Sequence, residues 1–239
     1  MADLDYIEQN GQKFIHVSTI STAAANEQFM QNVQLVQRQR QALVALSQIL
    51  SPKEKELMAG AIKDREAALN KNNAQMTQSY GFSLARNYVH QIVNSQVFIK
   101  LTDEEYNKAK EEGVPADQFL VRANDKFRLI AKIPGAVEND LFRHNVQIVQ
   151  AQRDRLVQMN AALAQMQDGE AKSKLEEEIK TATQRLEADN KTMTEKYGFS
   201  LTRNYLLQVV ESKLYTAVNE EEFLKAQQAK PAEEAPAKE

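Results

Sequence analysis

The chain contains no cysteine and no tryptophan, and only seven glycines and five prolines occur among its 239 residues. The absence of cysteine excludes disulfides, thiol catalysis and cysteine-ligated zinc. Few glycines and prolines, together with many Gln, Ala, Glu, Lys and Leu residues, are typical of long helices in contact with solvent. The composition therefore predicts a predominantly helical protein.

An excess of charge of one sign is also missing, because 30 Lys and Arg residues stand against 33 Asp and Glu residues. This balance does not attract a polyanion, so we expect no nucleic-acid partner. The chain has no run of about 18 apolar residues, so we expect no membrane span. The N-terminal residues MADLDYIEQNGQ lack the basic and apolar regions of a secretory signal. This predicts a cytoplasmic protein, and an envelope location stays open if a native leader was replaced by a start methionine.

The chain repeats itself. The phrase YGFSLARNYV at Tyr80 returns as YGFSLTRNYL at Tyr197, 117 positions later. At a shift of 113 positions, NVQLVQRQRQALV from Asn32 and NVQIVQAQRDRLV from Asn145 agree at nine of thirteen residues. The second copy has therefore gained about one helical turn between these blocks, at the tip of a predicted hairpin. We interpret the chain as a tandem duplication, with a first module at 1–113, a second at 114–228 and a disordered tail at 229–239.

Each copy shows the same series of patterns. Alternating runs around Asn10-Gly11 predict a β-hairpin, and the second copy has Asn124-Asp125 at the corresponding turn. Helices are predicted over residues 24–50 and 52–79, a third helix near Ser83, and a short strand over QVFIKL. Capping boxes at Thr102 and Glu105, and at Asn219 and Glu222, predict a final short helix in each copy.

The repeated phrase is interpreted as a joint between helices. Gly81 can adopt the left-handed conformation that ends a helix, and Phe82 can then pack on Met76, with Phe199 and Met193 as the second pair. Ser83 and Ser200 are predicted to cap the next helix. This interpretation leaves four residues of the phrase unexplained: Arg86, Asn87, Arg203 and Asn204. They are predicted to bond the carbonyls of the preceding helix end, or alternatively to form a duplicated anion clamp.

Two arginines, Arg40 and Arg153, occupy a place in the helical stripe where an apolar residue is expected. Such a side chain can cover the seam, the interface between the two helices of the hairpin, with its aliphatic stem, or it can fix the register of the hairpin. A Gln-rich face on the first helix is predicted to be exposed surface, with an adaptable binding surface as the alternative: Gln34, Gln37, Gln39, Gln41 and Gln48.

No residue pattern predicts catalysis. None of the three histidines, His16, His90 and His144, has a counterpart in the other copy, and no phosphate-binding or nucleophile motif occurs. Runs of carboxylates alternate with Lys and Arg at helical spacing, which is typical of solvated faces. We therefore expect no enzyme, no cofactor and no metal.

The predicted architecture is α+β with helix dominant: two modules, each with a β-hairpin, a long antiparallel helical hairpin, and a return strand and helix. This layout is similar in outline to tentacled holdase chaperones of the Skp and prefoldin type, although no sequence motif is shared. The resemblance implies a scaffold or holdase-like protein that presents paired hairpins to a protein partner or an unfolded client, and a homo-oligomer is left open. The alternative is a ligand-binding or enzymatic module that uses a cleft between the copies.

Overall fold

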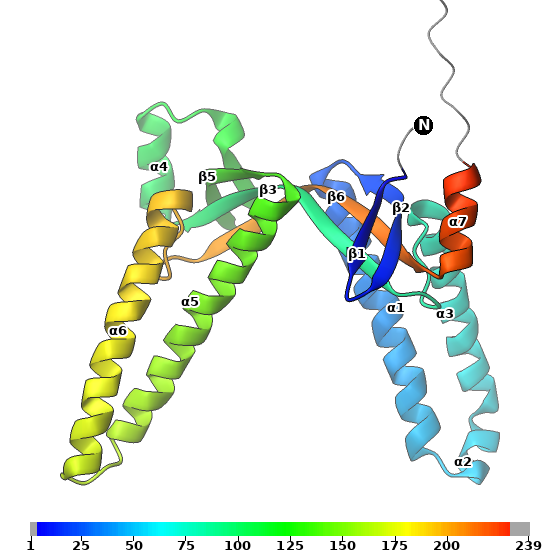
Figure 1. Cartoon of the computed structure of the whole chain (residues 1–239), viewed down its shortest axis with the longest axis horizontal. Coiled ribbons are helices and arrows are strands. Elements are labelled where there is room, and N and C mark those ends of the chain that lie inside the picture. Colours follow the sequence, from blue (N-terminus) through cyan, green and yellow to red (C-terminus); the bar gives the residue numbers. More distant parts are fainter. Residues whose placement is uncertain (1–3, 230–239) are drawn as a thin grey trace, which may run out of the picture. The chain divides into compact units, whose positions relative to one another are not determined.

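The computed structural model describes residues 4–229, which form seven α-helices, one short 3-10 helix and six strands (Figure 1). In chain order these are β1 Tyr6–Gln9, β2 Gln12–Ile20, α1 Ala23–Ile49, α2 Pro52–Leu57, α3 Ala59–Tyr80, β3 Tyr88–Leu101, α4 Asp103–Glu111, η1 Ala116–Gln118, β4 Phe119–Arg122, β5 Asp125–Pro134, α5 Ala136–Leu163, α6 Glu170–Tyr197, β6 Tyr205–Val218 and α7 Glu220–Ala229. The fold is α+β, and its strands pair in antiparallel fashion.

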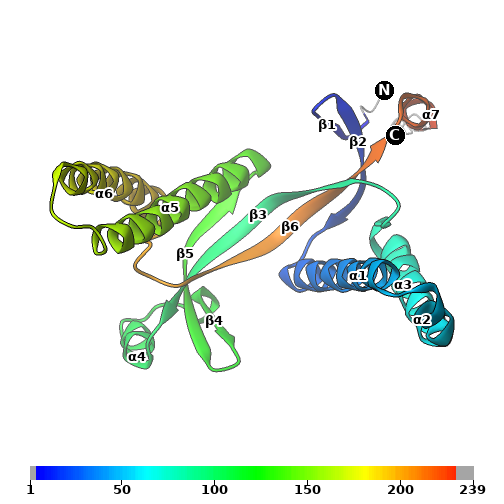
Figure 2. The ribbon, with the colours of Figure 1, turned by 90° about the horizontal axis from the view of Figure 1, so that it is seen from below.

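The chain divides into two compact units. The described residues up to Gln91 and from Glu211 onward form the first, and Ile92–Val210 form the second. Strands β3 and β6 run through both units, and Figure 2 shows them side by side. The strand order is therefore β1-β2-β6-β3 in the first unit and β6-β3-β5-β4 in the second. The predicted boundary at residues 113 and 114 follows the repeat in the sequence and lies inside the second unit.

Each unit combines elements from both halves of the sequence. In the first unit, Phe223 of α7 packs against Tyr6 of β1, with ring centroids 4.9 Å apart. In the second unit, α4 lies beside the β4–β5 hairpin (Figure 2), and Tyr106 of α4 packs against Phe119 at 5.0 Å. The short helix of one half thus completes the unit that holds the helical hairpin of the other half.

A long helical hairpin extends from the strands of each unit (Figure 1), and its buried residues pack together with strand residues. The core of the first unit includes Phe29 and Val36 of α1 and Met76 of α3. The core of the second unit contains the equivalent residues together with further ones: Phe142, Val146, Val149, Met193, Tyr197 and Phe199. The predicted apolar stripes are therefore buried at the base of each hairpin.

The predicted helix near Ser83 is wrong. Residues 84–86 form a turn, and β3 begins at Tyr88 and includes the predicted short strand QVFIKL. The apolar residues Tyr88 and Ile92 are four positions apart, which places them on one face of a strand as well as of a helix. The many β-branched and aromatic residues of YVHQIVNSQVFIKL favour the strand.

Three boundaries differ from the prediction. The second predicted helix is interrupted at Met58, which separates α2 from α3 in a stretch where residues 51–61 are all exposed. The second β-turn lies at Ala123 and Asn124, since Arg122 pairs with Asp125. Ala229 of the predicted tail ends α7, and the rest of that tail lies outside the described residues.

Substitution of Gly81 by alanine is expected to lower the free energy of unfolding by about 1–2 kcal/mol. Gly81 has φ +70, and an added Cβ would lie 3.2 Å from Cβ of Val17. Circular dichroism melting measures the change. Gly60→Ala is the matched control, because Gly60 lies in helix α3 with nothing within 4 Å of a Cβ, and it is expected to leave stability unchanged or raised. An unchanged melting temperature for Gly81→Ala would contradict the strained-turn explanation.

Candidate functional site

The repeated phrase forms a turn that leads from the second helix of each hairpin into the following strand. In the first unit, Gly81 ends α3 in the left-handed conformation, as predicted. Thr77 Oγ1 donates to the carbonyl of Phe82 at 2.8 Å, and the N–H of Leu84 donates to Asn73 Oδ1 at 2.8 Å. These bonds satisfy backbone groups at and beyond the helix end.

The second unit repeats this turn. Thr194 Oγ1 donates to the carbonyl of Phe199 at 2.7 Å, and the N–H of Leu201 donates to Asn190 Oδ1 at 2.9 Å. Phe199 lies in one buried cluster with Met193, as predicted. The predicted capping of a following helix by Ser83 and Ser200 is wrong, because each turn leads into a strand.

Arg86 and Arg203 do not bond the carbonyls of the preceding helix end. Arg86 Nη2 donates to Glu222 Oε1 at 2.8 Å. Arg203 donates to both carboxylate oxygens of Glu105, at 2.9 and 3.0 Å, and to the carbonyl of Lys100 at 2.9 Å. Each arginine therefore joins the turn of one sequence half to the capping-box glutamate of the other half.

These contacts change the acidity of the two glutamates. The hydrogen bond from the N–H of Thr102 lowers the pKa of Glu105, and the ion pair with Arg203 lowers it further. The hydrogen bond from the N–H of Asn219 lowers the pKa of Glu222, and the ion pair with Arg86 lowers it further. Because both folded-state pKa values are lowered, the stabilisation is present above the unfolded-state pKa and is lost as pH falls through the folded-state pKa.

Asn87 and Asn204 start the pairing of β3 with β6. The carbonyl of Asn87 accepts from the N–H of Ala217 at 2.9 Å, and the carbonyl of Asn204 accepts from the N–H of Lys100 at 2.8 Å. Arg86 and Asn87 belong to the first unit, whereas Arg203 and Asn204 belong to the second. Each of these backbone and ion-pair contacts therefore lies within one unit.

A cleft of about 520 Å³ lies at the base of the second hairpin and is lined by three cations, Lys100, Arg153 and Arg203, together with Phe199 and Tyr205. Each cation has a carboxylate partner: Lys100 Nζ lies 2.6 Å from Asp125, Arg153 Nη2 lies 3.3 Å from Asp154, and Arg203 pairs with Glu105. The positive charge that an anion would meet is therefore largely compensated.

A hydrogen bond that involves a glutamine joins the two helices of each hairpin. Of the two arginines predicted to cover the interface or to fix the register, Arg40 Nη1 donates to the carbonyl of Leu84 at 3.4 Å, and Arg153 lines the cleft. Across the seam, Asn72 Nδ2 donates to Gln39 Oε1 at 3.1 Å in the first hairpin. In the second hairpin, at the equivalent position, Gln152 Nε2 donates to Asp189 Oδ2 at 2.7 Å. Gln39 is therefore part of the seam, while four residues of the predicted Gln-rich face are exposed: Gln34, Gln37, Gln41 and Gln48.

The sequence analysis missed a buried polar pair in each unit. In the first unit, Ser212 donates to Asn26 Oδ1, and Asn26 Nδ2 donates to the carbonyls of Ile20 and Thr22. In the second, Ser95 donates to Asn139, which in turn donates to three carbonyls: Val93, Ile133 and Gly135. Asn recurs at a shift of 113 and Ser at a shift of 117, which is the signal that the sequence offers for these pairs, although recurrence alone does not show burial.

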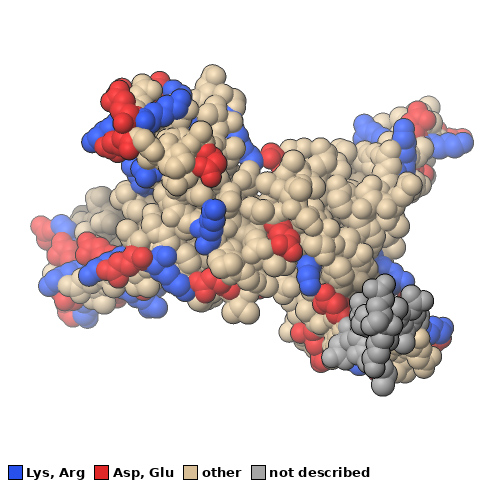
Figure 3. Space-filling model, turned by 90° about the horizontal axis from the view of Figure 1, so that it is seen from above, with Lys and Arg blue, Asp and Glu red and all other residues tan. Residues whose placement is uncertain are grey.

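The hairpins carry exposed apolar side chains far from the cores. Residues 51–61 at the tip of the first hairpin are all exposed, and they include Leu57 at 79% and Met58. Ile49, just before the tip, is 74% exposed. On the face shown in Figure 3, Lys and Arg side chains lie among Asp and Glu side chains wherever charged residues gather. The tip of the first hairpin also carries Lys53, Glu54, Lys55 and Glu56, so its exposed apolar side chains lie beside charges of both signs.

Among residues 4–229, no helix is long and apolar enough to cross a bilayer, and no group of three or more His, Cys, Asp or Glu side chains is arranged to hold a metal. Comparison with protein-family models, curated proteins and solved structures finds no match.

Proposed function

We propose that the chain is a non-catalytic interaction protein, a scaffold or holdase-like chaperone, that presents its helical hairpins to protein partners. The observation that carries this proposal is the exposed apolar tip of the first hairpin, with Ile49, Leu57 and Met58. Covering a large apolar side chain contributes about 1.5–3 kcal/mol, so this tip favours contact with a partner's apolar surface.

The distribution of buried residues supports the same function. Phe29, Val36 and Met76 anchor the base of the first hairpin, while the described helical residues from 37 to 75 include none that is fully buried. A firmly packed base with a solvated outer half allows the outer half to adapt, because local stability follows local burial. Such a hairpin suits contact with clients of varied shape.

We further infer that the chain arose by tandem duplication and imitates a dimer within one polypeptide. The same order of elements occurs twice, since β1, β2, α1, α3, β3 and α4 correspond to β4, β5, α5, α6, β6 and α7. The Asn–Ser pairs and the Arg–Glu pairs also recur, and each joins the two sequence halves as in a swapped dimer. The left-handed glycines Gly81 and Gly198 recur at the ends of α3 and α6.

Light scattering of an unfolding, aggregating client, with and without this chain at stoichiometric ratios, tests the proposal. Suppression of the scattering is the expected result. Scattering that is unchanged by an equimolar amount of the chain would overturn the holdase function and leave a dedicated scaffold, to be tested by affinity capture of the native partner.

The second candidate is a ligand-binding cleft, favoured by the 520 Å³ space beside Arg153 and Arg203 with its aromatic walls. Arg203→Ala separates this candidate from a structural role. We expect the substitution to lower the unfolding free energy by about 1 kcal/mol, less in high salt, because a half-exposed ion pair and a carbonyl bond are lost.

The control for Arg203→Ala is Arg143→Ala, since Arg143 lies 3.8 Å from Asp140 on an exposed helix face and should leave the melting temperature unchanged. Thermal melting in low and high salt, with and without phosphate and citrate as probe anions, measures both roles. Unchanged melting combined with loss of anion binding would favour the cleft over the structural role.

A further inference from the structure

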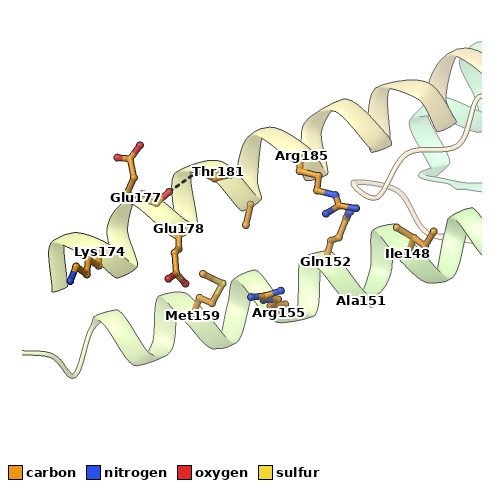
Figure 4. Close-up of a pocket in the computed structure, with 11 residues that line it drawn as sticks. Ile148, Ala151, Gln152, Arg155, Met159, Lys174, Glu177, Glu178, Thr181 and Arg185 are labelled. Atoms are coloured by element: carbon orange, nitrogen blue, oxygen red, sulfur yellow. Dashed lines mark hydrogen bonds between the residues drawn. The ribbon is translucent and has the colours of Figure 1, made fainter. Parts of the chain in front are cut away.

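An elongated groove of about 920 Å³ runs between α5 and α6 in the second hairpin (Figure 4). Its apolar lining comes from both helices: Ile148, Ala151 and Met159 on α5, and Ala182 on α6. From Ile148 to Met159 the groove follows α5 for about three turns, roughly 16 Å. The groove is therefore long enough for several turns of another helix.

Two alanines on facing helices explain why a groove opens between α5 and α6. Ala151 and Ala182 leave room where the first hairpin has Arg38 and Arg65, at shifts of 113 and 117. In the inner part of the groove, a hydrogen bond from Gln152 to Asp189 crosses between the two helices. The other amide atom, Gln152 Oε1, is buried beside the groove with no hydrogen-bond partner in the part of the chain that the structure describes. An occupant with a donor could satisfy this atom.

Charges of opposite sign mark the two ends of the groove. Arg155 on α5 and Arg185 on α6 flank its inner part, and among the described residues neither has an ion-pair or hydrogen-bond partner. Glu177, Glu178 and Lys174 line the outer part, where Lys174 pairs with Glu170 at 2.6 Å, and Figure 4 shows Glu178 directed across the groove toward Met159. Arg185 follows Glu178 by seven residues, about two turns or 10.5 Å.

We propose that this groove docks an amphipathic helix of a protein partner. The apolar face of that helix covers the groove floor, an acidic residue faces Arg155 and Arg185, and a basic residue seven positions away faces Glu178. A helix packed along two others buries their shared seam, and charges of both signs determine its placement. A fatty acid would use only the arginines, whereas this groove offers complementary charge at both ends. The proposal rests on the proposed function and names the partner chemistry of its second hairpin.

The test uses two fluorescent helical peptides of about 18 residues with the same leucine face. One peptide carries Glu and Lys seven positions apart, and the other carries Lys at both positions. By fluorescence anisotropy, the unmodified chain is expected to bind the Glu/Lys peptide about tenfold more tightly. The Arg155→Glu/Arg185→Glu variant is expected to prefer the Lys/Lys peptide, because Lys174 is then the only cation among the residues that line the described groove.

Two further variants test whether the effect depends on the position of the charges and on the open groove. Arg38→Glu/Arg65→Glu makes the same two charge reversals on the helices of the first hairpin, about one turn from the places that correspond to residues 155 and 185, and is expected to keep the Glu/Lys preference. Ala151→Leu/Ala182→Leu fills the groove without changing charge and is expected to weaken both peptides. Equal affinity of the unmodified chain for both peptides, a preference that does not reverse, or equal effects of the two charge reversals would each overturn the proposal.

Client light scattering with the same variants separates this proposal from the proposed function. If the unmodified chain suppresses scattering but the peptide preference does not reverse, the groove proposal fails and the holdase function stands. If the preference reverses while the unmodified chain leaves scattering unchanged, the groove is supported and the holdase function fails.

Discussion

Asn139→Ala is expected to lower the free energy of unfolding of the second unit by about 3–5 kcal/mol, the largest effect of any single substitution considered for this chain. Asn139 is fully buried, accepts the Ser95 hydroxyl and donates to three backbone carbonyls. Alanine would leave these groups without a partner and would open a cavity beside them. Several unsatisfied buried groups and lost packing together account for an effect of this size.

Hydrogen–deuterium exchange measures the loss of stability separately in each of the two units. Faster exchange is expected in Leu129–Ile133 of β5 and in the first turns of α5, while β2 in the first unit changes less. Gln147→Ala is the control, because Gln147 is exposed on the same helix and should leave exchange unchanged. Asn26→Ala is expected to produce the converse pattern, with faster exchange in β2. Equal protection in the Asn139→Ala and Gln147→Ala proteins would show that the buried amide does not hold the second unit.

Ile49→Glu/Leu57→Glu is expected to reduce suppression of client aggregation severalfold, with the melting temperature almost unchanged. Both side chains are more than 70% exposed, so they contribute little to the folded chain but supply apolar surface to a client. Two added carboxylates would oppose burial of the tip against an apolar partner. Light scattering at equal molar ratios, with circular dichroism melting alongside, measures both quantities.

Gln41→Glu/Gln48→Glu is the matched control for the tip, since both glutamines are exposed on the same hairpin and the charge change is identical. Retained suppression in this control would assign the loss to apolar surface rather than to net charge. Full suppression by the Ile49→Glu/Leu57→Glu protein would instead remove the tip from the binding surface.

Local patterns predicted the elements that depend on neighbouring residues. The helical hairpins, the Asn10-Gly11 turn and both capping boxes agree with the structure, because hydrophobic spacing and cap chemistry act within a few residues. The helix predicted near Ser83 failed because a spacing of four is compatible with both helix and strand. Composition of the following segment, rich in Val, Ile and aromatic residues, was the better guide.

The site residues show the limit of the same approach. The left-handed conformation of Gly81 and Gly198 could be predicted, because it depends only on the local geometry of a helix end. The partners of Arg86 and Arg203 could not, because these arginines pair with glutamates 136 and 98 positions away. The buried pair of Asn26 with Ser212 joins residues 186 positions apart. An exposed and a buried Asn look alike in a sequence, and recurrence does not separate them, since the exposed Asn87 and Asn204 recur at a shift of 117 just as the buried Asn26 and Asn139 recur at a shift of 113.

By itself, the sequence determined the repeat, the lengths and buried stripes of the hairpins and the turns that end them, because these depend on contacts between near neighbours. Only the tertiary structure decided that β3 and β6 pass between the units, so that each terminal helix completes the unit of the other half. The two halves have nearly the same pattern, and pairing within a half or between halves would bury similar strands. The choice is made by long-range contacts, the Asn–Ser and Arg–Glu pairs among them, whose partners no local pattern reveals.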